Sequence, residues 1–252
     1  NNLGSYYSSV GQMTLALEYL NKGLDVYIEL KDKEGMATSY SNIGGLHDKL
    51  GNKKEVIANY QKAYDLIKQT SDKRSEAIIL QNIGISYGEA GNVKIGLEYL
   101  QKALIAMEEL KEKKGIYSVL INIGGIYYRD GNYKLSEEYT LKCLKIAKEI
   151  DYAGGVATCY LRLGNANGYK EEYKKADEYF RMAYKLSEAD NQERALVDVL
   201  NSMAAFQLKR GDVDSALYNY NKSLKMADKL QFKLGKSNAI KGLSQIYFDR
   251  GD

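Results

Sequence analysis

The sequence has no proline and no tryptophan among its 252 residues, and it contains only one histidine and two cysteines. Because a linker of the usual Pro-rich kind is excluded, we expect a single domain with no internal boundary. The two cysteines, Cys143 and Cys159, exclude a disulfide framework and allow at most one bridge. Both lie at apolar positions of helical patterns, and we interpret them as small buried side chains. This weakly favours a reducing compartment, so we predict a cytoplasmic protein, with a periplasmic sensor region as the alternative.

The scarcity of histidine and cysteine also argues against catalysis. His47 is the single histidine, so the chain has no His and Cys cluster that could bind a metal or assist a nucleophile. The glycines follow helix ends and do not form a strand-to-helix phosphate loop. Adjacent carboxylates such as Glu108 and Glu109 diverge on a helix. We therefore predict no enzymatic activity, no metal and no cofactor.

Neither sign of charge is in excess, since 36 Lys and Arg residues stand against 33 Asp and Glu residues, a formal charge of +3. Nucleic-acid binding needs basic side chains clustered on one face. No stretch approaches the roughly 20 apolar residues that span a bilayer. Residues 1–30 also lack a basic segment followed by an apolar run. We predict neither direct nucleic-acid binding nor membrane insertion of this chain.

What the chain does contain is a repeat of forty residues. Five pairs lie on this grid, and Glu171 is the one exception: Gly51-Asn52, Gly91-Asn92, Gly131-Asn132, Gly211-Asp212 and Gly251-Asp252. A second glycine series has the same period and continues with small residues: Gly4, Gly44, Gly84, Gly124, Gly164, Ala204 and Ser244. Self-similarity at such a period indicates a solenoid, in which each unit buries its apolar face against its neighbours.

Each unit has the pattern of two helices. Between Met36 and Leu50 the apolar residues are spaced by three and four, which predicts a helix A over about residues 34–50. Gly51 is suited to end that helix in a left-handed conformation, and the Asn52 side chain can cap the next helix. A second stripe predicts a helix B that closes near Thr70. The repeat is therefore an antiparallel helical hairpin, and the fold class is all-α.

The mid-helix glycines need a compensating reason, because glycine costs about 1 kcal/mol relative to alanine inside a helix. Close contact between helix A and helix B is that reason. Small residues recur on helix B at the matching phase: Ala63, Ala103, Cys143, Ala183 and Ser223. Large residues beside them are expected to fill the remaining space: Tyr60, Leu100, Phe180 and Tyr220. His47 occupies a slot held by tyrosine in other units, and we interpret it as a packing residue.

These residues resemble the tetratricopeptide repeat. The first complete unit carries the motif at Tyr40, Ile43-Gly44, His47, Val56, Tyr60 and Ala63, and the fourth at Ala176, Phe180 and Ala183. The likeness covers the whole chain, although the usual unit has about 34 residues and this one has forty with no proline after helix B. Units of this length are similar to those of kinesin light chains, spindle-orientation adaptors and, still more, bacterial signalling proteins. The resemblance implies a right-handed superhelical solenoid whose concave face binds extended peptides.

The grid sets the expected boundaries. A partial repeat covers residues 1–33, a helix A of a further repeat covers 234–252, and five repeats lie between them at 34–73, 74–113, 114–153, 154–193 and 194–233. Solenoids need polar terminal caps, yet Tyr6 and Tyr7 at one end and Tyr247 and Phe248 at the other are apolar. We expect that the natural chain continues in both directions, or that arrays associate end to end.

The family resemblance implies that helices A line the concave face, at Thr38, Ser41, Asn42, Gly45, Asp48 and Lys49 in the first complete unit. One of these positions forms a ladder of amides: Asn2, Asn42, Asn82 and Asn122. An amide offers both a donor and an acceptor to a peptide backbone, and related adaptors use asparagine in this slot. The alternative is that each Asn braces adjacent helices of its own array.

The ladder breaks at Arg162, and the neighbouring lining positions become Tyr128, Arg129, Asn165 and Tyr169. Arginine suits a carboxylate and tyrosine is favoured at interfaces, so this is the candidate anchoring patch for an acidic or C-terminal peptide. The same unit has Asn167 in place of tyrosine and Glu171 in place of the capping glycine, which predicts a shifted or frayed turn. Drift in a tolerant repeat and a site selected for binding both explain these changes.

Two functions follow from this pattern. The first is a protein-interaction scaffold that binds a peptide or helix of a partner in its concave groove, through Asn42, Asn82, Asn122, Tyr128, Arg129, Arg162, Asn165 and Tyr169. The second is a sensory or regulatory region of a larger bacterial signalling protein, such as a histidine kinase or a transcription regulator.

Overall fold

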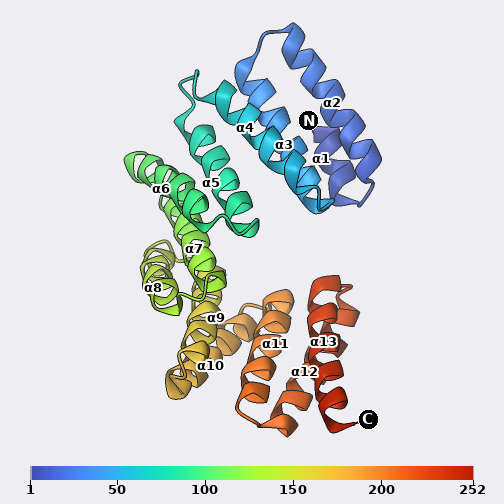
Figure 1. Cartoon of the computed structure of the whole chain (residues 1–252), viewed down its shortest axis with the longest axis vertical. Helices are drawn as coiled ribbons and strands as arrows, with labels where there is room; N and C mark the ends of the chain where they lie inside the picture. The colour runs from blue at the N-terminus through green and yellow to red at the C-terminus, as the bar shows by residue number, and fades with distance from the viewer. Residues whose placement is uncertain (1, 252) are drawn as a thin grey trace. The chain divides into compact units, whose positions relative to one another are not determined.

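The computed structural model describes residues 2–251, which contain thirteen helices and no strand (Figure 1). Asp252, the last member of the repeated Gly-Asn or Gly-Asp pairs, lies outside them. The first six helices are α1 (Asn2–Ser9), α2 (Met13–Glu29), α3 (Lys33–Lys49), α4 (Lys53–Ile67), α5 (Lys73–Glu89) and α6 (Val93–Glu109). The others are α7 (Lys113–Arg129), α8 (Tyr133–Glu149), α9 (Ala153–Tyr169), α10 (Tyr173–Ala189), α11 (Glu193–Lys209), α12 (Val213–Lys229) and α13 (Lys233–Arg250).

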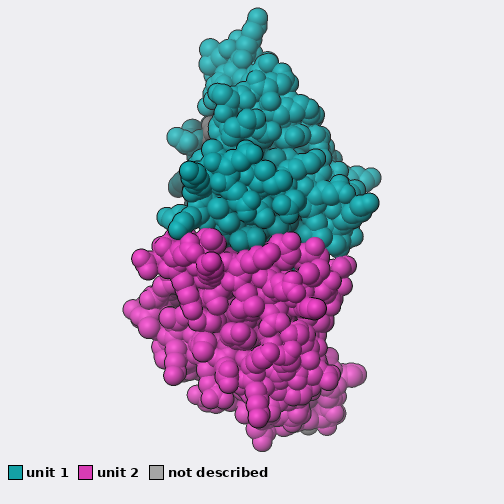
Figure 2. All heavy atoms as spheres, turned by 90° about the vertical axis from the view of Figure 1, so that its left-hand side faces the viewer, with its two compact units in different colours: residues 1–126 teal, residues 127–252 magenta. Residues whose placement is uncertain are grey.

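The chain divides into two compact units, residues 1–126 and 127–252 (Figure 2). Within the first unit α3 packs against α4 and α5 against α6, and within the second α9 packs against α10 and α11 against α12. Each pair is one repeat of the sequence grid. The predicted all-α fold of antiparallel helical pairs is therefore confirmed. The expectation of a single domain over the whole chain stays a prediction.

The turn from helix A to helix B is the same in every repeat that the structure describes. Gly51 has φ 76° and Gly131 has φ 80°, which are left-handed conformations that glycine adopts without a Cβ penalty. Glu171 takes the same conformation with φ 63°. Helix α9 ends at Tyr169, in register with the other helices A. The expected shift or fraying of this turn is therefore wrong, because Glu171 accepts the strained conformation and keeps the turn in place.

The expected cap at Asn52 is also wrong. Its side chain makes no capping hydrogen bond, and its Nδ2 lies 3.4 Å from His47 Nδ1. Asn132 does cap, since its Oδ1 accepts from the Leu135 amide at 3.2 Å. Asp212 accepts from the Ser215 amide at 3.2 Å. The grid position therefore supplies a cap only in some repeats.

The turns from helix B to helix A have a feature that the sequence pattern did not indicate. Residues other than glycine take left-handed conformations there, again at intervals of forty: Lys31, Lys111, Asp151, Asn191 and Gln231, with φ between 49° and 55°. At the equivalent turn between Lys31 and Lys111, the chain instead turns through Ser71. There the Asp72 side chain accepts a hydrogen bond from the Ser75 amide at 3.0 Å. Polar side chains at these corners are exposed, so their backbone geometry carries the structural role.

Close helix contact at the mid-helix glycines is present, although its partners differ from those expected. A Cβ on Gly44 would lie 3.0 Å from the Tyr60 ring, and one on Gly164 would lie 2.7 Å from the Phe180 ring. A Cβ on Gly84 would lie 2.8 Å from the Gly96 carbonyl oxygen. The large residue of helix B thus packs directly on the glycine. Only Gly84 meets the facing backbone this closely among these three.

Apolar side chains are exposed on both terminal helices. On α13 the exposed fraction is 80% for Phe248, 43% for Tyr247 and 63% for Leu234, and on α1 Tyr6 is 58% exposed. Tyr7 instead stacks on Tyr19 with 5.2 Å between ring centroids. No helix within residues 2–251 is both long and apolar enough to cross a bilayer.

Replacing Glu171 with glycine should stabilise the protein. The left-handed conformation costs a non-glycine residue about 1 to 2 kcal/mol, and the added freedom of the unfolded chain offsets about half of this. We expect a net gain of about 0.5 to 1 kcal/mol in the free energy of unfolding. Thermal and denaturant unfolding of Glu171→Gly will measure it. The matched control is Gly211→Glu, which should lose about as much since its φ is 80° with open space around it. Equal unfolding of Glu171→Gly and the parent would contradict the strain argument.

The two glycine environments give a second prediction. Gly84→Ala forces a Cβ against the Gly96 backbone and should destabilise by about 2 kcal/mol. Gly45→Ala meets only the Tyr60 hydroxyl at 3.5 Å, an ordinary contact, and should gain up to about 1 kcal/mol in helix propensity. Denaturant unfolding of both variants will compare them, and a loss of similar size in both would show that close approach at Gly84 is not the cause.

Candidate functional site: a groove on the helices A of the second unit

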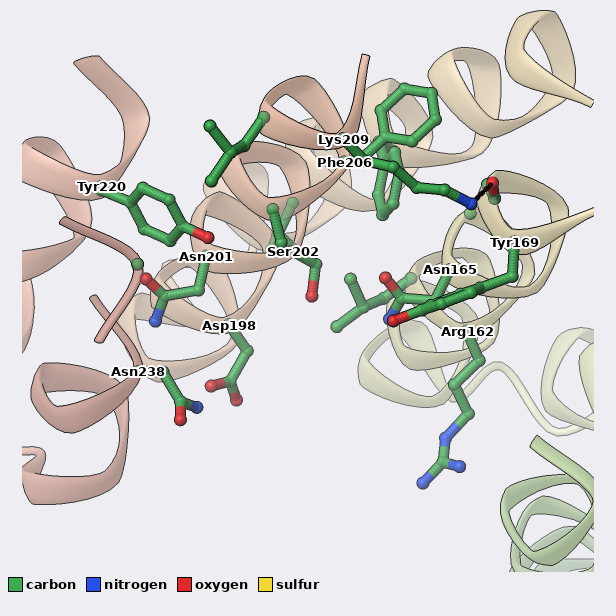
Figure 3. A pocket seen from close by; sticks show the side chains of 18 of the residues that line it. Arg162, Asn165, Tyr169, Asp198, Asn201, Ser202, Phe206, Lys209, Tyr220 and Asn238 are labelled. Carbon is green, nitrogen blue, oxygen red and sulfur yellow. Dashed lines mark hydrogen bonds between the residues drawn. The ribbon is translucent and has the colours of Figure 1, made fainter. Parts of the chain in front are cut away.

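A groove of about 1030 Å³ lies on the second unit, along the helices A α9, α11 and α13 (Figure 3). Arg162, Asn165 and Tyr169 come from α9, while Asp198 and Ser202 come from α11. Asn238, Lys241 and Gln245 come from α13. These helices alternate with helices B, so the same face of each helix A contributes to one continuous surface.

The groove contains half of the candidate residues inferred from the sequence. Tyr128, Arg162, Asn165 and Tyr169 line it. Arg129 is exposed at the end of α7 and does not line this groove.

The Asn ladder belongs to the first unit, where Asn42, Asn82 and Asn122 are half-buried. The Asn122 amide donates to the Ser118 carbonyl at 2.7 Å, a bond within its own helix. That amide is therefore used inside the array, whereas a contact to a peptide stays a prediction for all three residues.

Three tyrosines form an aromatic cluster at one end of the groove. Tyr133 stacks on Tyr169 with 4.8 Å between ring centroids, and Tyr128 meets Tyr169 edge to face at 5.6 Å. Lys209 lies over the Tyr169 ring at 4.9 Å and donates to the Gly168 carbonyl at 3.2 Å. Burial, together with Tyr169, raises the pKa of the Tyr128 hydroxyl well above its usual range, so it stays a neutral donor. The cluster presents a rigid amphipathic surface.

A polar network holds the carboxyl end of α9, where the fourth repeat departs from the grid. The Asn167 amide donates to Glu137 at 3.0 Å and to the Leu163 carbonyl at 2.9 Å. Lys170 pairs with Glu137 at 2.6 Å and with Glu172 at 2.6 Å. Burial lowers the pKa of Lys170, but these two carboxylates outweigh it and the pKa is raised. Asn167 is thus a structural partner of helix α8 in place of the usual tyrosine.

The groove residues of α11 and α13 were not among the candidates, although the sequence contained a signal for them. Asp198 and Asn238 lie 160 and 200 residues after the lining position Thr38. Asn201 and Ser202 lie 160 residues after the lining positions Ser41 and Asn42. Extending the concave positions along the grid would have found them.

The groove is lined by polar and aromatic side chains. No group of three His, Cys, Asp or Glu side chains within the described residues 2–251 could hold a metal ion. Cys143 and Cys159 form no disulfide, and both side chains are fully buried. A hydrogen bond with Cys159 and burial both raise the pKa of the Cys143 thiol, which keeps it protonated and unreactive.

Helical hairpins that recur every forty residues and pack on their neighbours belong to the class of α-helical repeat solenoids. The family described as Tetratricopeptide repeat matches residues 1–69 and 115–189, more than half of the chain. The protein belongs to the tetratricopeptide repeat family. No curated protein sequence matches it.

Several solved structures share the fold. BtubC (BKLC) from P. vanneervenii is 15% identical with a TM-score of 0.71, over 85% of this chain and 91% of that one. The apo form of RapI is 16% identical with a TM-score of 0.73, over 91% and 82%. The Rap conjugation gene regulator of the plasmid pLS20, solved in complex with the Phr* peptide, is 15% identical with a TM-score of 0.71, over 99% and 67%. At these identities the likeness concerns the fold alone.

The ion pairs next to the groove predict a pH dependence. Hydrogen bonds from Lys170 and Lys175 lower the pKa of Glu172 from its ordinary 4.5 to about 2. A lowered pKa in the folded state adds stability above pH 4.5 that is lost as the pH falls through 2. The melting temperature of Glu172→Gln should therefore lie below that of the parent at pH 6 and approach it near pH 2. Thermal melts across this range will test this, and a constant difference would show that the charge of Glu172 is not responsible.

Proposed function

We propose that the protein is an interaction scaffold whose second unit binds an extended peptide or a helix of a partner protein in the groove of α9, α11 and α13. The observation that carries this proposal is the groove itself, in which amides and charged groups surround the exposed edge of an aromatic cluster. Membership of the tetratricopeptide repeat family supports it, because the family fold is in general a non-catalytic interaction scaffold. The Rap regulator of similar fold was solved with a bound peptide, which adds support at the level of the fold.

The groove offers two kinds of contact to a peptide. Asn165, Ser202 and Gln245 supply donors and acceptors for the backbone without reading its sequence. Tyr169, which is 50% exposed, and the partly exposed Tyr128 supply apolar area that is already ordered by ring contacts. A preformed aromatic surface loses little side-chain entropy on binding. We therefore expect the cluster to contribute most of the affinity and the amides to fix the direction of the chain.

Arg162 gives this groove a preference for negative charge near the tyrosines. A guanidinium can donate two hydrogen bonds to a carboxylate. We propose that it binds an acidic side chain or the C-terminal carboxylate of the peptide. Hydrogen bonds to charged groups contribute about 1.5 to 3 kcal/mol, which corresponds to roughly a tenfold to hundredfold change in affinity.

The test begins with affinity selection from a random mixture of synthetic octapeptides with free termini, followed by sequencing of the retained peptides. The tightest acidic peptide is then titrated by calorimetry against the parent and Arg162→Ala. We expect at least a tenfold loss for this peptide and less than a twofold loss for an amidated version in which Asp and Glu are replaced by Asn and Gln.

The control variant is Arg181→Ala, which removes the same charge from the exposed surface of α10. It should bind both peptides like the parent. Equal losses for the acidic and the neutral peptide in Arg162→Ala would contradict the role of Arg162. Retained peptides that bind Tyr169→Ala and Arg162→Ala as well as the parent would move the binding surface elsewhere.

A second candidate is a sensory or regulatory role within a larger signalling protein, favoured by the solved fold relative that is itself a gene regulator. In that role, peptide binding would change the curvature of the helical array and so the state of an attached output domain. Small-angle scattering with and without the selected peptide would test the first step. An unchanged scattering profile at saturation would oppose this candidate and leave the scaffold function intact.

A further inference from the structure

Asp198 is a carboxylate inside the groove without a cation beside it. It lies on the face of α11 that lines the groove, and Figure 3 shows its side chain pointing into the open space next to Asn238. The carboxylate forms no ion pair or hydrogen bond with any side chain from residue 2 to residue 251. Burial alone raises the pKa of Asp198, so the fold disfavours the charged carboxylate and supplies no compensating ion pair or hydrogen bond among the described residues. A charge held in this way is more typical of a binding site than of a structural ion pair.

Asn201 holds a second unsatisfied acceptor, which is buried in the lining of the same groove. Its side chain is buried, with an exposed fraction of 7%, and its Nδ2 donates to the Gly235 carbonyl at 3.0 Å. That bond anchors the amide to α13, while its Oδ1 is buried with no hydrogen-bond partner among the described residues. Buried acceptors without partners are rare because each costs about 1 to 3 kcal/mol. Asp198 and Asn201 lie three residues apart on one face of α11.

The other charged groups of the groove do not satisfy these acceptors. Lys209 is held by the Gly168 carbonyl and the Tyr169 ring at the tyrosine end. Lys241 and Asp249 line the groove from α13, and neither pairs with Asp198. Arg162 comes from α9, with its guanidinium away from the carboxylate in Figure 3. The groove therefore has a cationic part near the tyrosines and a separate acceptor part on α11.

We propose that Asp198, with the amide of Asn238 beside it, binds a cationic group of the peptide, which is an ammonium or guanidinium. This inference rests on the proposed function and names the charge pattern of its ligand. A peptide that satisfies both parts of the groove carries an acidic group for Arg162 and a basic group for Asp198. Its source is either a Lys or Arg side chain or the free N-terminal amine, which share the chemistry of a charged nitrogen donor.

The test repeats the octapeptide selection on the parent, on Asp198→Asn and on Asp214→Asn. Asp214 is the matched control, because its side chain is 98% exposed on α12 and its loss changes the net charge equally. We expect basic residues to be enriched among peptides retained by the parent and by Asp214→Asn, and this enrichment to disappear with Asp198→Asn. Equal enrichment on all three proteins would overturn the proposal.

Calorimetry then separates the two sources. The tightest selected peptide is synthesised as selected, with Lys and Arg replaced by Met, and with an acetylated N-terminus. Asp198→Asn should lower the affinity for the unmodified peptide at least tenfold. It should cause no further loss of affinity for the modified peptide that no longer carries the cation bound by Asp198. The modification that removes this coupling identifies the source. Losses of the same size for all three forms would contradict a cation at Asp198.

Stability provides a readout that does not depend on the peptide. Since burial disfavours the Asp198 charge, Asp198→Asn should fold and melt at the same or a higher temperature than the parent at pH 7. A lower melting temperature would show that the carboxylate has a structural role and would overturn the inference. If no octapeptide binds the parent, the proposed function fails together with this inference. If peptides bind the parent and Asp198→Asn retains the same enrichment of basic residues, this inference alone fails.

Discussion

The contact between a glycine of helix A and a large residue of helix B is the constraint on which the rest of the structure depends. With a Cβ on Gly164 the ring of Phe180 would be displaced, and with one on Gly84 the carbonyl of Gly96 would be in the way. This close approach fixes the distance between the helices of a pair. It also fixes which face of helix A remains for the groove, because the opposite face is already committed to helix B. The proposed recognition surface is therefore a consequence of this packing.

The fourth repeat departs from the pattern of the other repeats without loss of the fold. Asn167 replaces a stacked tyrosine, and Lys170 joins Glu137 to Glu172 beside it. Glu171 maintains the left-handed turn at an energetic cost. These polar contacts hold α9 in register while its outward face carries Arg162 and Tyr169. The substitutions at Asn167 and Glu171 are thus compensated by contacts within the same repeat. Both sequence drift in a tolerant repeat and selection for a binding site are compatible with such compensation.

The groove also shows how its proposed ligand would be selected. A charged group in a partly desolvated groove favours a ligand group of opposite charge and opposes one of the same charge. Arg162 and Asp198 would together reject peptides of a single charge sign. The tyrosine cluster has no such preference, since it gains mainly from buried apolar area. Affinity and specificity are thus assigned to different side chains of one surface.

The sequence by itself determined the helical pairs, their boundaries to within a few residues and the repeat family, because glycine spacing and apolar periodicity are local properties. It also predicted that Arg162, Asn165 and Tyr169 share a face, since that follows from the helical period. The tertiary structure alone decided that Tyr133 completes the aromatic cluster, that Asn122 bonds within its helix and that Asp198 lies in the groove with no ion pair among the described residues. These depend on which side chains of different repeats meet, and such contacts arise only once the helices are packed.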